Sequence, residues 1–133
     1  MRTIVDTSVW SLALRRKSIP SDSAVVEKLN ALIRDGHLVY LLGVILLETL
    51  QGIKSNEQRE KVRQFLEPFP VLTLEREDYV EAANLSCLCR SKGIQASTVD
   101  FLIAGAAIRN DCALLTTDKD FLHIAKRSSL EIL

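Results

Sequence analysis

The stretch Arg2-Thr3-Ile4-Val5-Asp6-Thr7-Ser8-Val9-Trp10 decides the fold class of this chain. Its first half is a short apolar run, which predicts a buried strand over residues 3–5. Asp6 or Thr7 can cap a helix that continues to Leu14. A strand that leads directly into a helix is the repeating unit of sheets with parallel strands.

The same alternation of strand and helix continues along the chain. Further strands are predicted at 38–41, 71–73 and 113–116, with an edge strand at 131–133, and helices from 23 to before Gly36 and at 44–54, 57–66, 76–92, 98–110 and 119–126. This order predicts an α/β fold: a single domain over residues 1–133 with a central, mostly parallel sheet and helices on both faces.

Composition limits the classes of function. The 133 residues carry 17 basic and 17 acidic side chains, so the chain does not coat nucleic acid by charge alone. Aromatic residues make up 5%, which argues against a base-stacking platform. Three cysteines, with Cys87 and Cys89 on different faces of a helix, predict reduced thiols and a cytoplasmic protein. We expect no leader peptide and no membrane span.

Four acids lie where apolar segments end or are interrupted: Asp6, Glu48, Asp100 and Asp118. Asp6 and Asp118 follow predicted strands, and ligands of parallel sheets bind at the carboxyl ends of the strands. Asp100 opens the helix before the 113–116 strand, and Glu48 lies one turn into the helix after the 38–41 strand. The fold therefore predicts that all four acids meet at one edge.

Each acid also has a structural alternative. Asp6 and Asp118 are suitable helix N-caps, and Ser97-Thr98-Val99-Asp100 matches a capping box. Glu48 has only Val44, Ile45, Gln51 and Gly52 as its neighbours along the helix, so its alternative is a position facing solvent.

Gathered carboxylates repel one another, by roughly 3 kcal/mol for a pair about 5 Å apart at an effective dielectric near 20. One or two Mg²⁺ ions, or Mn²⁺ in their place, would relieve this repulsion and supply a Lewis acid. Oxygen ligands without cysteine or histidine favour these ions over zinc. We interpret His37 and His123 as surface or helix-end residues.

Four short segments resemble the motifs of PIN-domain nucleases, in the family's order and across nearly the whole chain. They are Val5-Asp6-Thr7-Ser8-Val9-Trp10, Leu47-Glu48-Thr49-Leu50-Gln51-Gly52, Asp100-Phe101-Leu102-Ile103-Ala104 and Leu115-Thr116-Thr117-Asp118-Lys119-Asp120-Phe121. The chain length and motifs are most similar to VapC-type toxins of bacterial toxin–antitoxin pairs.

The resemblance implies an Mg²⁺-dependent endoribonuclease that hydrolyses phosphodiester bonds of structured RNA, such as tRNA or rRNA. Asp6, Asp100 and Asp118 would bind metal, and Glu48 would orient the nucleophilic water. Hydrogen bonds that fix these carboxylates would come from Thr7, Ser8 and Thr117, with Asp120 an additional acid or a helix start facing solvent. The resemblance also implies a homodimer inhibited by a small cognate antitoxin.

Other interpretations remain open. The run Arg15-Arg16-Lys17 would either hold RNA phosphates or form a solvated helix end. A PIN-like scaffold could bind RNA or protein without cutting. A haloacid-dehalogenase phosphatase would need a second Asp where Ser8 stands, and a response-regulator receiver would need an acidic pair after the first strand.

Overall fold

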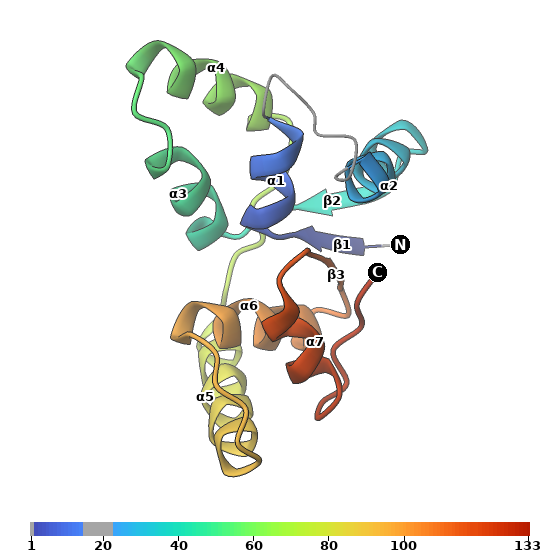
Figure 1. Cartoon of the computed structure of the whole chain (residues 1–133), viewed down its shortest axis with the longest axis vertical. Coiled ribbons are helices and arrows are strands. Elements are labelled where there is room, and N and C mark those ends of the chain that lie inside the picture. Colours follow the sequence, from blue (N-terminus) through green and yellow to red (C-terminus); the bar gives the residue numbers. More distant parts are fainter. Residues whose placement is uncertain (1, 15–22) are drawn as a thin grey trace.

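The computed structural model describes residues 2–14 and 23–133, so the predicted basic run at 15–17 lies outside the described residues (Figure 1). Strands and helices alternate as expected. The strands are β1 (Arg2–Val5), β2 (Leu38–Tyr40) and β3 (Ala113–Leu115). The helices are α1 (Thr7–Ala13), α2 (Ser23–Arg34), α3 (Gly43–Gln51), α4 (Asn56–Leu66), α5 (Arg76–Ser91), α6 (Thr98–Arg109) and α7 (Lys119–Ala125).

The three strands form one parallel sheet in the order β2-β1-β3. In the register of the central strand, Ile4 lies opposite Tyr40 on one side and Leu114 on the other. Figure 1 shows α1 to α4 on one side of the sheet and α5 to α7 on the other. The prediction of an α/β fold with helices on both faces is confirmed.

Two predicted strands are each reduced to a single bridge. Val71 pairs only with Leu41, and Ile132 pairs only with Leu114. Residues 71–73 cannot extend the pairing because the chain turns into α3 directly after Leu41, with Leu42 as the N-cap. The predictions of full strands at 71–73 and 131–133 were therefore wrong, although both segments do lie at the sheet edges.

The predicted helix at 44–54 also ends early, because Gly52 takes the C-cap position of α3. Glycine stabilises a helix less than other non-proline residues do, which favours ending the helix there. The other helix limits agree with the predictions to within a few residues.

The core fills both sides of the sheet. Trp10 of α1 is fully buried and makes edge contacts with Phe65 and Phe69, with ring centroids 6.4 and 5.1 Å apart. On the other side, α5 and α6 approach so closely that a Cβ atom on Gly105 would lie 2.9 Å from the backbone of Ala82. Small residues here allow the two backbones to come together, which fixes the position of α6 against α5.

A buried carboxylate ties the far ends of these two helices together. Asp78 of α5 is 1% exposed and accepts hydrogen bonds from Arg109 Nε at 3.1 Å and Asn110 Nδ2 at 3.0 Å. Its other oxygen accepts the backbone N–H of Glu75 at 2.7 Å. This network anchors the C-terminal end of α6, at the opposite end of that helix from Asp100.

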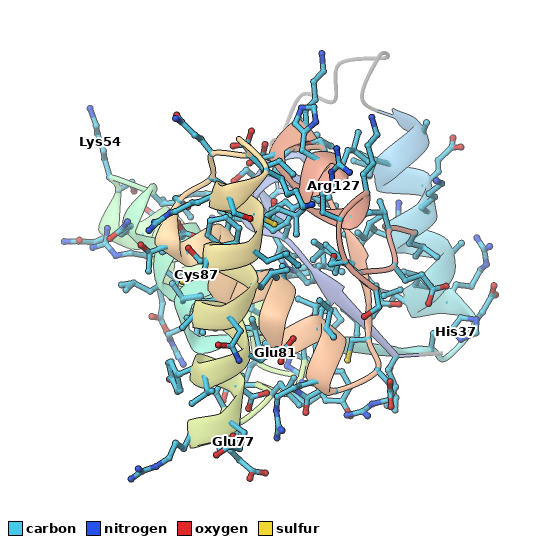
Figure 2. The ribbon with its side chains drawn as sticks, turned by 90° about the horizontal axis from the view of Figure 1, so that it is seen from below. His37, Lys54, Glu77, Glu81, Cys87 and Arg127 are labelled. Atoms are coloured by element: carbon cyan, nitrogen blue, oxygen red, sulfur yellow. The ribbon has the colours of Figure 1, made fainter. Side chains whose placement is uncertain are left out.

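The cysteines are free thiols, as expected: Cys89 and Cys112 are buried, and Cys87 lies on the outer face of α5 (Figure 2). Burial raises the pKa of the Cys89 and Cys112 thiols. His37 and His123 are exposed. None of the described helices is both long enough and apolar enough to cross a bilayer.

Candidate metal centre at the carboxyl edge of the sheet

Asp6 follows the central strand and is 6% exposed. Its N–H donates to Leu115 O at 3.0 Å, which continues the pairing of β1 with β3 by one residue. Asp6 occupies the N-cap position of α1, but its side chain makes no capping hydrogen bond. The structural alternative for this acid, a helix N-cap, is therefore correct for its position, although the side chain does not supply the capping hydrogen bond.

The Asp6 carboxylate is held by hydroxyl groups instead. Its Oδ2 atom accepts hydrogen bonds from Ser8 Oγ at 2.8 Å and Thr116 Oγ1 at 3.0 Å. Thr116 Oγ1 in turn accepts the N–H of Asp118 at 3.0 Å, and Ser8 Oγ accepts the N–H of Thr117 at 3.1 Å. We name this arrangement of Asp6, Ser8, Thr116 and the two backbone N–H groups the hydroxyl clasp.

The clasp explains why Thr116, and not Thr117, holds the acid. Thr117 contributes its backbone N–H to the clasp, and the residue is exposed. Val5 pairs with Leu115, so the next residues along the two strands are Asp6 and Thr116. This register identifies Thr116, and it is known only once the pairing of β1 with β3 is known.

Glu48 lies on α3 and is linked to Asp6 through the neighbouring residue. Thr7 Oγ1 donates to Glu48 Oε1 at 3.1 Å. Glu48 also lines a cavity of about 340 Å³ between α1, α3 and α4. The other lining residues are Ser11, Leu14, Thr49, Gly52, Ile53, Gln58 and Val62.

Asp100 does occupy the capping box of α6. Its N–H donates to Ser97 Oγ at 3.1 Å, and its Oδ2 accepts the Ser97 N–H at 3.2 Å. Burial raises the pKa of the Asp100 carboxyl, the Ser97 hydrogen bonds oppose that rise, and the Asp118 and Asp120 charges add to it. The capping box at Asp100 is confirmed, and the capping role leaves this residue next to two other acids.

Asp118 caps α7 by accepting the N–H of Asp120 at 2.9 Å. One carboxylate oxygen from each of Asp100, Asp118 and Asp120 lies within 4.8 Å of the other two. We name these three residues the acid cluster. Asp120 is half-buried and part of this cluster, whereas a solvent-facing helix start was the favoured expectation.

The acid cluster does not include Asp6 or Glu48, although the clasp connects Asp6 to the backbone of Asp118. Three half-buried carboxylates at this spacing offer the hard oxygen ligands that Mg²⁺ and Mn²⁺ prefer. Burial is the main cause of the raised pKa of Asp100, and the charges of Asp118 and Asp120 add to it. The residues present therefore fit a divalent cation.

A family model of the PIN domain matches residues 3–127. The chain belongs to the PIN-domain family. The match includes all four acids and every residue of the hydroxyl clasp, so it covers the carboxyl edge of the sheet. No match was found among curated protein sequences.

Solved structures share the fold of this PIN domain at low sequence identity. FitAcB from Neisseria gonorrhoeae is 20% identical, with a TM-score of 0.77, over 98% of this chain and 96% of that one. VapBC2 from Rickettsia felis, bound to a DNA fragment from its promoter, is 18% identical with a TM-score of 0.79, over 100% and 98%. VapC20 from Mycobacterium tuberculosis, a toxin that cleaves the sarcin-ricin loop, is 16% identical with a TM-score of 0.66, over 90% and 92%.

Proposed function

We propose that this PIN domain is an Mg²⁺-dependent endoribonuclease toxin of the VapC type, a single domain that hydrolyses phosphodiester bonds in structured RNA such as tRNA or rRNA. The observation that carries the proposal is the acid cluster of Asp100, Asp118 and Asp120 beside the clasped carboxylate of Asp6. Similar structures that include a toxin cleaving the sarcin-ricin loop support an RNA substrate.

In this proposal, Asp6 and the acid cluster hold the divalent cation. The bound cation supplies a Lewis acid that stabilises the charge developing on the phosphate. Ser8 and Thr116 fix the orientation of the Asp6 carboxylate before the cation and the RNA bind. Thr7 fixes Glu48 in the same way, and Glu48 accepts a hydrogen bond from the attacking water and aims it at the phosphorus atom.

We also propose that a small antitoxin neutralises the protein and that the active form is a homodimer. Similar structures are complexes of the VapBC and FitAB types, which supports an antitoxin partner. The cavity beside Glu48 combines apolar side chains (Leu14, Ile53 and Val62) with neutral polar ones (Ser11, Thr49 and Gln58) and one carboxylate. That combination suits an antitoxin segment with apolar side chains and a single cationic group.

The test is cleavage of total cellular RNA by the purified protein in Mg²⁺, in Mn²⁺ and in EDTA, together with Asp6→Asn and Asp100→Asn. We expect cuts at discrete sites with either metal, and loss of cutting in EDTA and in both variants. Circular dichroism of each variant checks that the fold is retained. A folded wild type that binds metal and leaves all RNA intact would instead indicate a binding scaffold.

A further inference from the structure

A second cavity, of about 500 Å³, lies on the outer face of α7 and has a basic and apolar lining. Its lining residues are Lys119, Leu122, His123, Ala125, Lys126 and Ile132. The charged members, Lys119 and Lys126, are both exposed, and Leu122 is 47% exposed although it is a large apolar side chain. On a chain with no net charge, this cavity is a local positive site with an apolar surface.

Helical spacing places these residues together on α7. Lys119, Leu122, His123 and Lys126 are separated by three, one and three positions, so they lie on one face of the helix. The two lysines are separated by roughly 10 Å along the helix axis.

The cavity and the acid cluster share the N-terminal end of α7. Lys119 lines the cavity, and its two neighbours in the sequence, Asp118 and Asp120, belong to the acid cluster. Among the described residues, neither lysine forms an ion pair with an acid, so neither of them neutralises the acid cluster. Both amines are therefore available to an anionic ligand.

We propose that this cavity binds single-stranded RNA next to the bond that is cut. This inference rests on the proposed nuclease function. Lys119 and Lys126 hold two phosphates of the strand, and one base lies on the apolar surface of Leu122 and Ile132. A free phosphate would need only one amine, whereas two amines at this spacing beside an exposed leucine fit a polynucleotide.

The experiment measures binding of a fluorescein-labelled single-stranded RNA by fluorescence anisotropy in EDTA, where binding does not depend on cutting. The variant is Lys119→Gln with Lys126→Gln. The matched control is Lys28→Gln with Lys61→Gln, which removes two exposed lysines from α2 and α4 on the other side of the sheet (Figure 1). Each phosphate contact contributes about 0.7 to the slope of log affinity against log salt for single strands.

We expect the α7 variant to bind severalfold more weakly and to lose about 1.4 from the salt slope, while the control keeps the wild-type slope. In Mg²⁺, the same variant should show a raised KM with kcat largely kept, because the lysines bind the substrate and its transition state equally.

The proposal is overturned if the α7 variant binds RNA as the wild type does, if the control loses as much affinity, or if the wild type does not bind the RNA. Lysine-dependent binding without any cutting in Mg²⁺ or Mn²⁺ would support the RNA site and contradict the nuclease. Loss of antitoxin binding with unchanged RNA binding would assign the cavity to the protein partner and also overturn the proposal.

Discussion

Thr116 serves two parts of the site with one hydroxyl group. It donates to the Asp6 carboxylate at 3.0 Å and accepts the Asp118 N–H at 3.0 Å, so it sets the direction of one acid and the position of the turn that carries another. A hydroxyl that orients a metal-binding carboxylate contributes to affinity and activity without touching the metal. We therefore expect this residue to matter more than its exposed neighbour, Thr117.

The first prediction compares the two threonines. Thr116→Val removes the hydroxyl that orients Asp6 while keeping the shape of the side chain, and should lower RNA cleavage or metal affinity by roughly 10- to 100-fold. Thr117→Val is the control, because Thr117 contributes only its backbone N–H. Cleavage rates and metal titrations of both variants provide the measurement, and equal losses in the two would contradict the role of the clasp.

The sequence indicated the positions of the acids and two of their hydrogen-bond partners, Thr7 and Ser8, but it did not indicate Thr116. Asp6, Asp100 and Asp118 could be located because strand ends and helix starts are visible as changes from apolar to polar residues. Thr116 and Thr117 could not be separated in this way, since both follow the same apolar run. The choice depends on which residue lies opposite Asp6, and that is a property of the strand pairing.

At the scale of elements, the position of α6 depends on its contact with α5. Gly105 is the point of closest approach, where an added Cβ would lie 2.9 Å from the backbone of Ala82. Backbone atoms cannot move aside as a flexible side chain can. The start of α6, which carries Asp100, is therefore positioned by packing that lies more than a turn away.

The second prediction concerns this contact. Gly105→Ala should destabilise the protein by about 1–3 kcal/mol through overpacking, even though alanine favours a helix interior by about 1 kcal/mol. The control is Gly43→Ala on α3, where an added Cβ meets nothing within 4 Å. Urea unfolding of both variants tests the prediction, and a Gly105→Ala protein as stable as Gly43→Ala would refute it.

The third prediction concerns the buried carboxylate at the other end of α6. Asp78→Ala leaves Arg109 and the Glu75 N–H without their acceptor, and should cost about 1–3 kcal/mol of unfolding free energy. The control is Glu77→Ala in the same turn of α5, which is exposed and should cost under about 1 kcal/mol (Figure 2). Chemical denaturation distinguishes the two, and a small effect at Asp78 would mean that the network contributes little.

Helices were more predictable than strands for a physical reason. The capping box at Ser97 and the cap at Ser55 are local features, and both are present as hydrogen bonds. Residues 71–73 have the composition of a strand, but a strand needs a partner of matching length. Because β2 gives way to α3, that segment makes one bridge, and no local pattern reports this.

For the whole molecule, the acid cluster opposes folding when no cation is bound. Burial raises the pKa of Asp100 above its ordinary value of 3.8, and the neighbouring acids add to that rise. A carboxyl whose pKa is raised by folding binds its proton more tightly in the native state. The contribution of this carboxyl to the free energy of unfolding is therefore stabilising below pH 3.8, and it is lost as the pH rises through the pKa of the native state.

The fourth prediction follows from this sign. In EDTA, Asp100→Asn should have a higher Tm than the wild type at neutral pH, and the difference should vanish in acid. Saturating Mg²⁺ should reverse the order, since a cation at a hundredfold excess over its Kd adds about 2.7 kcal/mol to a protein that binds it. Glu131→Gln, an exposed acid, is the control in thermal scans across pH. A wild type whose Tm responds to neither pH nor metal would contradict the prediction.

The two strands that meet at the site are apolar where they lead into it. Ile4 and Val5 of β1, and all three residues of β3, are buried, so this part of the two strands has no polar side that would mark its correct alignment. A shift of one residue between such strands loses little apolar contact. It would, however, move Asp6 away from Thr116 and leave a nearly buried charge without its hydroxyl partners. The hydroxyl clasp therefore favours the correct alignment of β1 with β3, and a chain that folds out of register cannot bring Asp6 to Thr116 beside the turn that carries Asp118.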